Sequence, residues 1–349
     1  MEKLNWQLLA KKSLEGEIIS KEEAHSILNC EDDSLLLLLD AAFSVRKKYF
    51  GKKVKLNFLM NAKSGLCPED CSYCSQSKDS EAKINKYPFL SEKEVLAAAK
   101  NAVDSKAKRF CMVNSGRGPT DREIEEVASA IKKVKNIYPE LEICVCLGLL
   151  KEHHAEQLKN AGVHAYNHNL NTSEDFYSEI CSTHTFKDRV ETVERVKHAG
   201  LSSCSGSLFG MGEKDEDIIE LAFSLRKIGV DSIPINFLMA IPGTLLQGKN
   251  ELTPQKCLKI LCLFRLINPQ SEIRIAGGRE HHLRWLQPLG LYAANSIFIG
   301  DYLTTKGQKI EADIGMIRDL GFEIEGHENL ENSLKGQNQV LEEFSVRLK

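Results

Sequence analysis

Short apolar runs alternate with longer amphipathic stretches from residue 54 onward. The apolar runs, rich in Val, Ile, Leu and Phe, predict eight strands, at residues 54–60, 109–113, 141–147, 163–167, 202–209, 232–238, 272–276 and 296–299. Between them, apolar positions recur at helical spacing and predict helices that include residues 91–103, 122–134, 187–198, 215–228 and 254–267. Helix-start signals agree, because Ser91, Thr120 and Thr253 are of the types that cap helices and Pro254 suits a first turn.

This order of elements indicates the fold class. Short apolar strands joined by helices favour parallel pairing, because such strands need burial on both faces. Eight strand–helix units predict an α/β fold of the closed (βα)8 TIM-type barrel, which typically takes roughly 250 residues. A doubly wound open sheet is the competing interpretation, but it normally carries a glycine-rich phosphate turn after its first strand, where this chain has cysteines.

The pattern divides the chain into three parts. We expect a helical N-terminal extension at residues 1–50, the barrel at 51–322 and a polar C-terminal tail at 323–349. The longest apolar runs, such as residues 35–39, are far shorter than the roughly 20 residues that span a membrane. Residues 1–10 lack the features of a secretory signal. The expected location is therefore cytoplasmic, with no membrane partner.

Composition narrows the class of partner. Of the 349 residues, 27% are charged and 42% are hydrophobic, and the formal net charge is −3. These values are typical of a globular protein and exclude a disordered chain. The chain has no excess of Lys and Arg to neutralise phosphates, so we expect no nucleic-acid partner. Small molecules are the expected ligands.

Three cysteines follow the first predicted strand directly. Cys67, Cys71 and Cys74 form a C-x3-C-x2-C array, and in a barrel this loop lies on the catalytic face. Three thiolates on one loop can hold three corners of an iron–sulfur cluster and leave one iron open. A zinc site is the first alternative, although structural zinc usually takes four protein ligands and no fourth Cys or His is near in sequence. Unligated thiols are the second alternative.

Further cysteines lie within the predicted strands. Cys111, Cys144 and Cys204 occur in the second, third and fifth, and Arg274 occurs in the seventh. Cys144 and Cys146 share one face of their strand, so side-chain alternation does not choose between them. Each could instead be a small core residue. Arg274 on its own suggests a partner for a carboxylate or ureido group. The cysteines without ligand spacing are expected to be ordinary thiols, namely Cys30, Cys181, Cys257 and Cys262.

Polar residues close several strands. Asn167, Asn169 and Asn171 end the fourth strand, and a buried amide is costly unless a polar ligand or the backbone satisfies it. Asn236 lies inside an apolar run, and its amide likewise needs a polar ligand or the backbone to satisfy it. The glycine-rich stretch 206–213 ends the fifth strand. An asparagine-rich or glycine-rich turn without a ligand is the alternative.

The cysteine array and the strand-end segments described above resemble those of a known enzyme family. The cysteine array with Tyr73 before its last cysteine resembles the signature of radical S-adenosylmethionine (SAM) enzymes. A closer likeness, to the biotin synthase family, extends from about residue 50 to residue 320 and is carried by residues 67–76, 109–112, 166–170, 204–206, 232–236, 274–280 and 294–298.

The resemblance implies roles for specific residues. It implies that Cys67, Cys71 and Cys74 hold a 4Fe-4S cluster whose open iron binds SAM. It implies that Cys111, Cys144, Cys204 and Arg274 hold an auxiliary 2Fe-2S cluster, the sulfur donor. It assigns Asn169, Asn171, Gly206, Gly210 and Glu213 to SAM, and Asn167 and Asn236 to dethiobiotin. Position 171 is often Asp in the family, and an amide there lacks charge assistance for a ribose hydroxyl.

The implied activity is radical-driven sulfur insertion into dethiobiotin to form biotin, catalysed by a sulfurtransferase. The resemblance also implies a flavodoxin-type or ferredoxin-type electron donor and a homodimer. One alternative is another radical SAM enzyme that uses no sacrificial cluster. A second is an iron–sulfur scaffold or redox sensor that does not cleave SAM.

Overall fold

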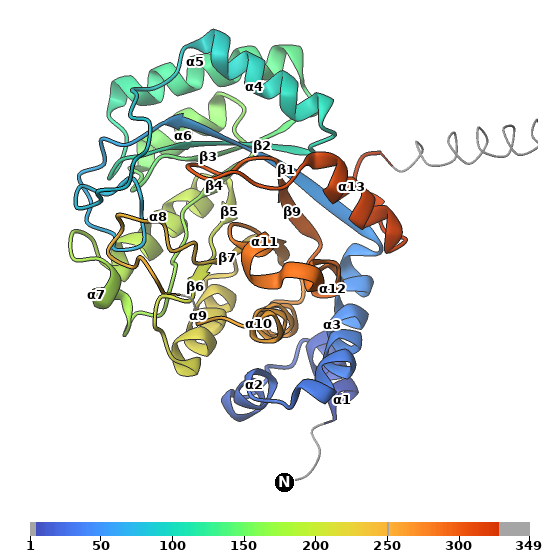
Figure 1. Cartoon of the computed structure of the whole chain (residues 1–349). Helices are drawn as coiled ribbons and strands as arrows, with labels where there is room; N and C mark the ends of the chain where they lie inside the picture. The colour runs from blue at the N-terminus through green and yellow to red at the C-terminus, as the bar shows by residue number, and fades with distance from the viewer. Residues whose placement is uncertain (1–4, 250, 328–349) are drawn as a thin grey trace, which may run out of the picture.

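Parallel strands close into a barrel, and the buried core extends from these strands to the helices packed around them (Figure 1). The structure is a computed structural model and describes residues 5–249 and 251–327. The ring runs in the order β1, β2, β3, β4, β5, β7, β8, β9, and β9 pairs with β1 to close it. The strands are β1 (Lys53–Lys63), β2 (Arg109–Asn114), β3 (Glu142–Cys146), β4 (Ala165–Asn167), β5 (Ser202–Cys204), β6 (Ser207–Phe209), β7 (Ser232–Phe237), β8 (Glu272–Ile275), β9 (Ser296–Ile299) and β10 (Glu323–Ile324). The predicted TIM-type barrel is confirmed.

Helices cover the outside of the barrel. They are α1 (Trp6–Glu15), α2 (Lys21–Leu28), α3 (Leu35–Phe50), α4 (Glu92–Asp104), α5 (Asp121–Ile137), α6 (Glu152–Asn160), α7 (Tyr177–Ile180), α8 (Phe186–His198), α9 (Asp215–Ile228), α10 (Pro254–Ile267), α11 (Arg279–Leu283), α12 (Gln287–Ala293) and α13 (Ile310–Asp319), with 3-10 turns at Asp32–Ser34 and Arg284–Leu286. The predicted caps form, because the Ser91 and Thr120 side chains accept from the Glu94 and Glu123 amides.

One predicted strand, 202–209, is interrupted in the structure. β5 pairs with β7 at Cys204 and Ser232, whereas β6 pairs with β7 from Ser207 and Ile235 onward. Opposite the gap lies Pro234, which has no N–H to donate to a strand ladder. The split is therefore a consequence of the neighbouring strand, and β5 and β6 together occupy one position in the ring.

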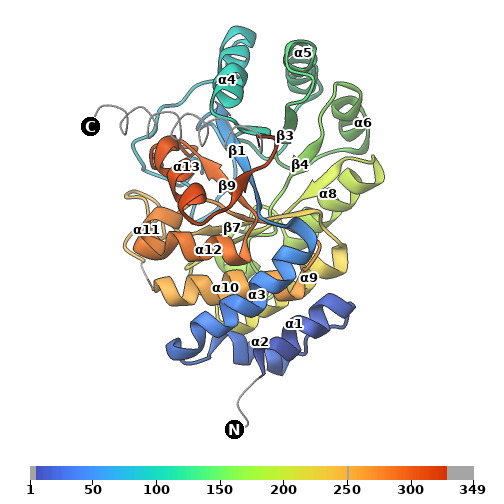
Figure 2. The same cartoon turned by 90° about the vertical axis from the view of Figure 1, so that its right-hand side faces the viewer.

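The two ends of the chain pack on different parts of the barrel. Helices α1 to α3 pack against α10 and α12 (Figure 2). At the other end, β10 adds in parallel to β1 through Lys53 and Glu323. The rest of the predicted polar tail, residues 328–349, lies outside the described residues. Among the residues that the structure describes, no helix is long and apolar enough to cross a membrane.

Ion pairs fill the barrel at the starts of its strands. The Arg109 guanidinium lies 2.9 Å from Glu142 and 3.1 Å from Glu272, and Lys55 Nζ lies 3.2 Å from Glu142. Arg109 is 3% exposed, so these charges balance one another with little water. Because this end is filled by paired side chains, ligands are expected at the opposite end, where the strands finish.

Gly206 lies in the gap between β5 and β6, where the backbones approach closely. A Cβ added there would lie 1.9 Å from the Pro234 carbonyl oxygen. We expect Gly206→Ala to lower the free energy of unfolding by about 3 kcal/mol, measured by urea denaturation. Gly315→Ala is the matched control, since a Cβ on this α13 glycine meets nothing within 4 Å. An unchanged unfolding midpoint for Gly206→Ala would contradict this packing.

Candidate active site

The three-cysteine loop leaves β1 and crosses the end of the barrel where the strands finish. Cys71 is buried, and Cys67 and Cys74 are half-buried. All three line a cavity of about 220 Å³, here called the outer cavity. The loop is held at its start by the Gly65 amide, which donates to Gln76 Oε1 over 2.9 Å. The structure therefore brings the predicted cysteines together around one space.

These thiols need a cation before they can act as ligands. A hydrogen bond with Cys181 and burial both raise the pKa of Cys71. Burial raises the pKa of Cys74 to about 11 and also raises that of Cys67. Since metal ligation requires thiolates, bound metal would supply the positive charge that this environment lacks. The donor set fits an iron–sulfur cluster held at three corners.

A second set of cysteines lies deeper in the barrel. Cys111 and Cys144 are directly paired in the register of β2 and β3, and they pack with Ala165 and Phe298. Both line a cavity of about 180 Å³, here called the inner cavity. Burial and a hydrogen bond with Cys111 raise the pKa of Cys144. Cys144 thus packs in the same group of buried side chains as Cys111. Side-chain alternation alone did not decide between Cys144 and Cys146.

Arg274 points at the third sulfur of this set. Its Nη1 donates to Cys204 Sγ over 3.6 Å, while Nη2 donates to Ser232 Oγ over 2.9 Å and to Glu272 Oε1 over 2.5 Å. The guanidinium also lines the inner cavity and is 1% exposed. Glu272 therefore balances the charge of Arg274 and orients it. The four residues grouped by family resemblance converge on one buried site.

The outer and the inner cavity adjoin and share part of their lining. Asn167 and Asn169 line both cavities, as do Val113, Cys146 and Leu303. The Asn167 Nδ2 donates to Asn169 Oδ1 over 2.9 Å and to Cys204 Sγ over 3.2 Å. Asn169 Oδ1 in turn accepts from the Gly206 amide over 3.1 Å. Ligands in the two cavities would meet across this shared wall.

Asn171 and Asn236 occupy different settings. Asn171 lines the outer cavity with a φ of 72°, a left-handed conformation that Asn tolerates, and its Nδ2 donates to the Tyr73 hydroxyl over 2.6 Å. Asn236 lines the inner cavity, but its Nδ2 donates to the Ser207 carbonyl over 2.9 Å and its Oδ1 accepts from the Gly277 amide over 3.0 Å. The backbone therefore satisfies the Asn236 amide.

The glycine-rich segment forms a self-contained turn. The Glu213 carboxylate accepts from the Gly210 amide over 2.7 Å and from the Met211 amide over 2.8 Å, and burial raises its pKa. Neither Gly210 nor Glu213 lines the outer or the inner cavity. Leu208 of the same segment lines an adjoining cavity of about 270 Å³ together with Asn169 and Asn171.

Arg189, on α8, was missed by the sequence analysis. It is 9% exposed, lines the outer cavity and donates to the Asn169 carbonyl over 2.7 Å and to His184 Nε2 over 2.8 Å. Among residues 5–249 and 251–327, no carboxylate lies within ion-pair distance of it. A buried cation without an anionic partner indicates a site for an anionic ligand group. The sequence offered one signal for this residue, because Arg189 falls on the buried face of the predicted helix at 187–198.

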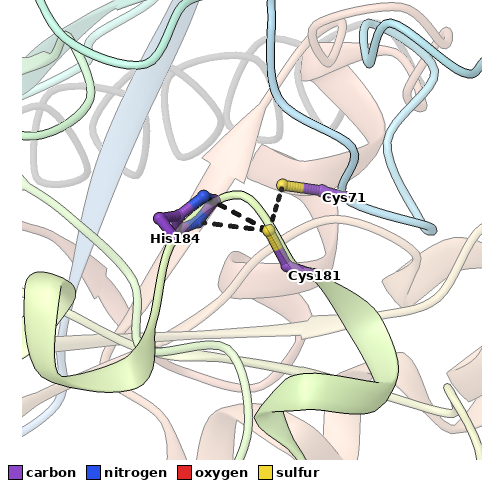
Figure 3. Close-up of side chains that lie close together, drawn as sticks. All are labelled: Cys71, Cys181 and His184. Carbon is purple, nitrogen blue, oxygen red and sulfur yellow. Dashed lines mark hydrogen bonds between the residues drawn. The ribbon is translucent and has the colours of Figure 1, made fainter.

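Cys181 was expected to be an ordinary thiol, yet it lies against the three-cysteine loop (Figure 3). Its Sγ is 3.7 Å from Cys71 Sγ and 3.2 Å from His184 Nδ1. No spacing pattern connects residues so far apart in sequence. Only the fold, which places the start of α8 beside the loop after β1, brings these side chains together.

Comparisons with known proteins agree with this geometry. The Radical SAM superfamily profile matches residues 63–225, and the Biotin and Thiamin Synthesis associated domain matches residues 234–323. The biotin synthase of Lysinibacillus sphaericus is 57% identical over 322 residues, which cover 92% of this chain and 97% of the relative. The biotin synthase of Halalkalibacterium halodurans is 56% identical over 334 residues, which cover 96% of this chain and 100% of the relative.

Solved structures support the fold. Methylornithine synthase superposes with a TM-score of 0.80 at 21% identity, over 90% of this chain and 97% of the other. The FeFe-hydrogenase maturase of Carboxydothermus hydrogenoformans superposes with a TM-score of 0.75 at 21% identity, over 91% of this chain and 78% of the other. At this level of identity the likeness concerns the barrel alone.

Proposed function

The chain belongs to the biotin synthase family of radical SAM enzymes, and from that membership we propose that it converts dethiobiotin into biotin by inserting sulfur. The single observation that supports this most is the pair of cavities that share Asn167 and Asn169 as a wall. One is lined by the three-cysteine loop and the other by Cys111 and Cys144. Cys204 contacts Arg274 and Asn167, which line the inner cavity. A radical formed on one side would reach a substrate on the other without crossing solvent.

The outer cavity is the proposed site of SAM cleavage. Cys67, Cys71 and Cys74 would hold the 4Fe-4S cluster that membership of the radical SAM superfamily implies. When bound, this cluster supplies the electron that breaks a C–S bond of SAM and yields the 5′-deoxyadenosyl radical. The surrounding residues keep water away from that radical, since Cys71 and the nearby Arg189 are both buried.

Some of the proposed SAM contacts line this cavity and others lie in the adjoining glycine-rich turn. Asn169 and Asn171 present amides at the edge of the cavity, and Gly206 holds Asn169 in place through its backbone amide. Gly210 and Glu213 would border the adenine from the adjoining turn. Arg189 offers the positive charge that the carboxylate of SAM requires, because the described part of the chain gives it no acidic partner.

Replacing Arg189 with methionine should weaken SAM binding. The loss of one charge-assisted contact predicts a rise in KM for SAM of about 10- to 100-fold with a smaller change in kcat. Steady-state formation of 5′-deoxyadenosine measures both constants. Arg195→Met is the matched control, because Arg195 is also on α8 but pairs with Glu191 at 2.8 Å and is partly exposed. Equal KM values in the two variants would argue against this role.

The inner cavity is the proposed site of sulfur insertion. Cys111, Cys144, Cys204 and Arg274 would hold the auxiliary 2Fe-2S cluster, which supplies the sulfur atom when bound. Asn167 and Asn236 would contact dethiobiotin. The proposal assigns none of the described residues as a general acid or base. The residues of the chain bind, orient and exclude water.

Two further features of the proposal rest on the family, namely a flavodoxin-type or ferredoxin-type electron donor and a homodimer. A cytoplasmic location and the division into a helical extension at 1–50, a barrel at 51–322 and a tail at 323–349 rest on the sequence pattern. Donor dependence and oligomeric state can be measured on the purified full-length protein.

An anaerobic assay tests the proposed function. Reconstituted, reduced protein is incubated with SAM and dethiobiotin, and 5′-deoxyadenosine and biotin are followed together by mass spectrometry. The proposal requires both products. Formation of 5′-deoxyadenosine without biotin would overturn the substrate assignment, and absence of both from iron-replete protein would overturn the radical SAM activity.

A further inference from the structure

Cys71, Cys181 and His184 form a compact group of potential metal ligands, hereafter the Cys71–Cys181–His184 group. One ligand atom from each lies within 4.8 Å of the others, and all three residues are buried. Figure 3 shows the Cys181 sulfur between the Cys71 sulfur and the His184 ring. Cys71 comes from the three-cysteine loop, whereas the other two come from the segment between α7 and α8.

The separations within this group suit one tetrahedral ion. Two thiolates at about 2.3 Å from the same ion lie roughly 3.8 Å apart, and a thiolate and an imidazole nitrogen lie roughly 3.6 Å apart. The Cys71 and Cys181 sulfurs are separated by 3.7 Å. The Cys181 sulfur is 3.2 Å from Nδ1 and 3.7 Å from Nε2 of His184. The two sulfurs are therefore spaced to share one ion.

The backbone holds this arrangement in place. The Ser72 amide donates to the Ile180 carbonyl over 2.9 Å, and the Ser182 amide donates to Asp70 Oδ1 over 3.0 Å. These bonds join the cysteine loop to the segment that carries Cys181 on both sides of the sulfur pair. The group is thus formed before any ligand arrives, which lowers the ordering cost of binding.

The surroundings of His184 are those of a metal-binding imidazole. Its Nδ1 bonds the Glu69 carboxylate, the carboxylate–histidine arrangement that fixes a ring for ligation through its other nitrogen. That other nitrogen, Nε2, accepts from Arg189 Nη2 over 2.8 Å and from Arg189 Nε over 3.1 Å. An ion bound at Nε2 would replace both hydrogen bonds, and Arg189 would keep its bonds to the Asn169 carbonyl and the Tyr177 hydroxyl.

We propose that the cluster-free chain binds one thiophilic divalent ion, zinc or ferrous iron, at the Cys71–Cys181–His184 group. Binding releases to solvent the thiol proton that Cys71 donates to Cys181, and no oxidation or reduction is involved. Cys71 is also a proposed ligand of the 4Fe-4S cluster. Occupation by a single ion therefore competes with cluster insertion. Cys181 and His184 set the affinity for the single ion and so the strength of this competition.

Cobalt binding to the full-length, cluster-free protein tests this site. The starting protein carries Cys67→Ala, Cys74→Ala, Cys111→Ala and Cys144→Ala, so neither the remaining members of the three-cysteine array nor the paired cysteines of the inner cavity can provide the ligands. Under anaerobic conditions we expect one Co²⁺ per chain with a thiolate-to-cobalt charge-transfer band. Zinc ion and ferrous iron, added in separate samples, should each remove this band.

Variants in that background identify the ligands. Adding Cys181→Ser should weaken binding at least about 10-fold, as expected for loss of a metal ligand. Adding Cys30→Ser, a half-buried thiol elsewhere in the chain, should leave binding unchanged. Circular dichroism verifies that both variants are folded. The exposed group of Asp121, His153 and His154 offers no sulfur, so cobalt bound there would produce no such band.

Two results would overturn the proposal. One is the absence of a thiolate band in the folded starting protein, and the other is an equal band with equal affinity after Cys181→Ser. The assay contains neither SAM nor dethiobiotin, so its outcome is independent of the proposed function.

Discussion

The Cys71→Ala variant is expected to form no 5′-deoxyadenosine above the background of cluster-free protein. Cys71 is the most deeply buried of the three cysteines in the outer cavity, at 7% exposed. If Cys67, Cys71 and Cys74 hold the cluster as proposed, removing the Cys71 sulfur would leave it only two protein ligands, and the cluster that binds SAM would not assemble. The measurement is 5′-deoxyadenosine released anaerobically in the presence of a chemical reductant.

Two comparisons make this result specific. Cys30→Ala removes a half-buried thiol that lines neither cavity and should retain the parent rate. Iron content and the visible absorption of the cluster should fall in Cys71→Ala and stay unchanged in Cys30→Ala. SAM cleavage by folded Cys71→Ala at the parent rate would show that the three-cysteine loop does not generate the radical.

The Cys204→Ala variant is expected to separate the two halves of the reaction. Cys204 contacts Arg274 and Asn167 in the inner site and does not line the outer cavity. We therefore expect 5′-deoxyadenosine to remain detectable while biotin falls below detection. Both products are measured in the same sample, and the unfolding midpoint checks that the buried cysteine can be shortened without loss of the fold.

The pair of variants distinguishes two sites from one. If Cys71→Ala and Cys204→Ala lose both products to the same extent while remaining folded, the division between radical formation and sulfur insertion is wrong. Biotin formation by Cys204→Ala at the parent rate would remove the inner cysteines from the sulfur-donating role. The predicted pattern is unequal loss, with the inner variant still cleaving SAM.

Much of the fold could be predicted from the hydrophobic pattern. The helices at 215–228 and 254–267 are found with the predicted bounds, as is the strand at 296–299. Their signals are local, because helical periodicity, caps and a short β-branched run are all contained within the segment. The split between β5 and β6 could not be predicted in the same way, since its cause, Pro234, is on the neighbouring strand.

The site was predictable where its residues are close in sequence or match the family. The three-cysteine array is local, so its spacing alone indicated a cluster. Cys144 and Cys146 share a face by alternation, and only the register of β2 and β3 shows that Cys144 is the one paired with Cys111. Arg189 and His184 line the outer cavity, and Cys181 contacts Cys71, through folding alone. No pattern in the chain connects them to the cysteine loop.

The source of the inserted sulfur is the most direct test of the two-site account. The protein is reconstituted with sulfide enriched in a heavy sulfur isotope, freed of unbound sulfide, and allowed one turnover with dethiobiotin and SAM. Mass spectrometry of the biotin then gives the origin of its sulfur. The account predicts that the isotope held by the protein appears in biotin. Biotin formed without the isotope would contradict it.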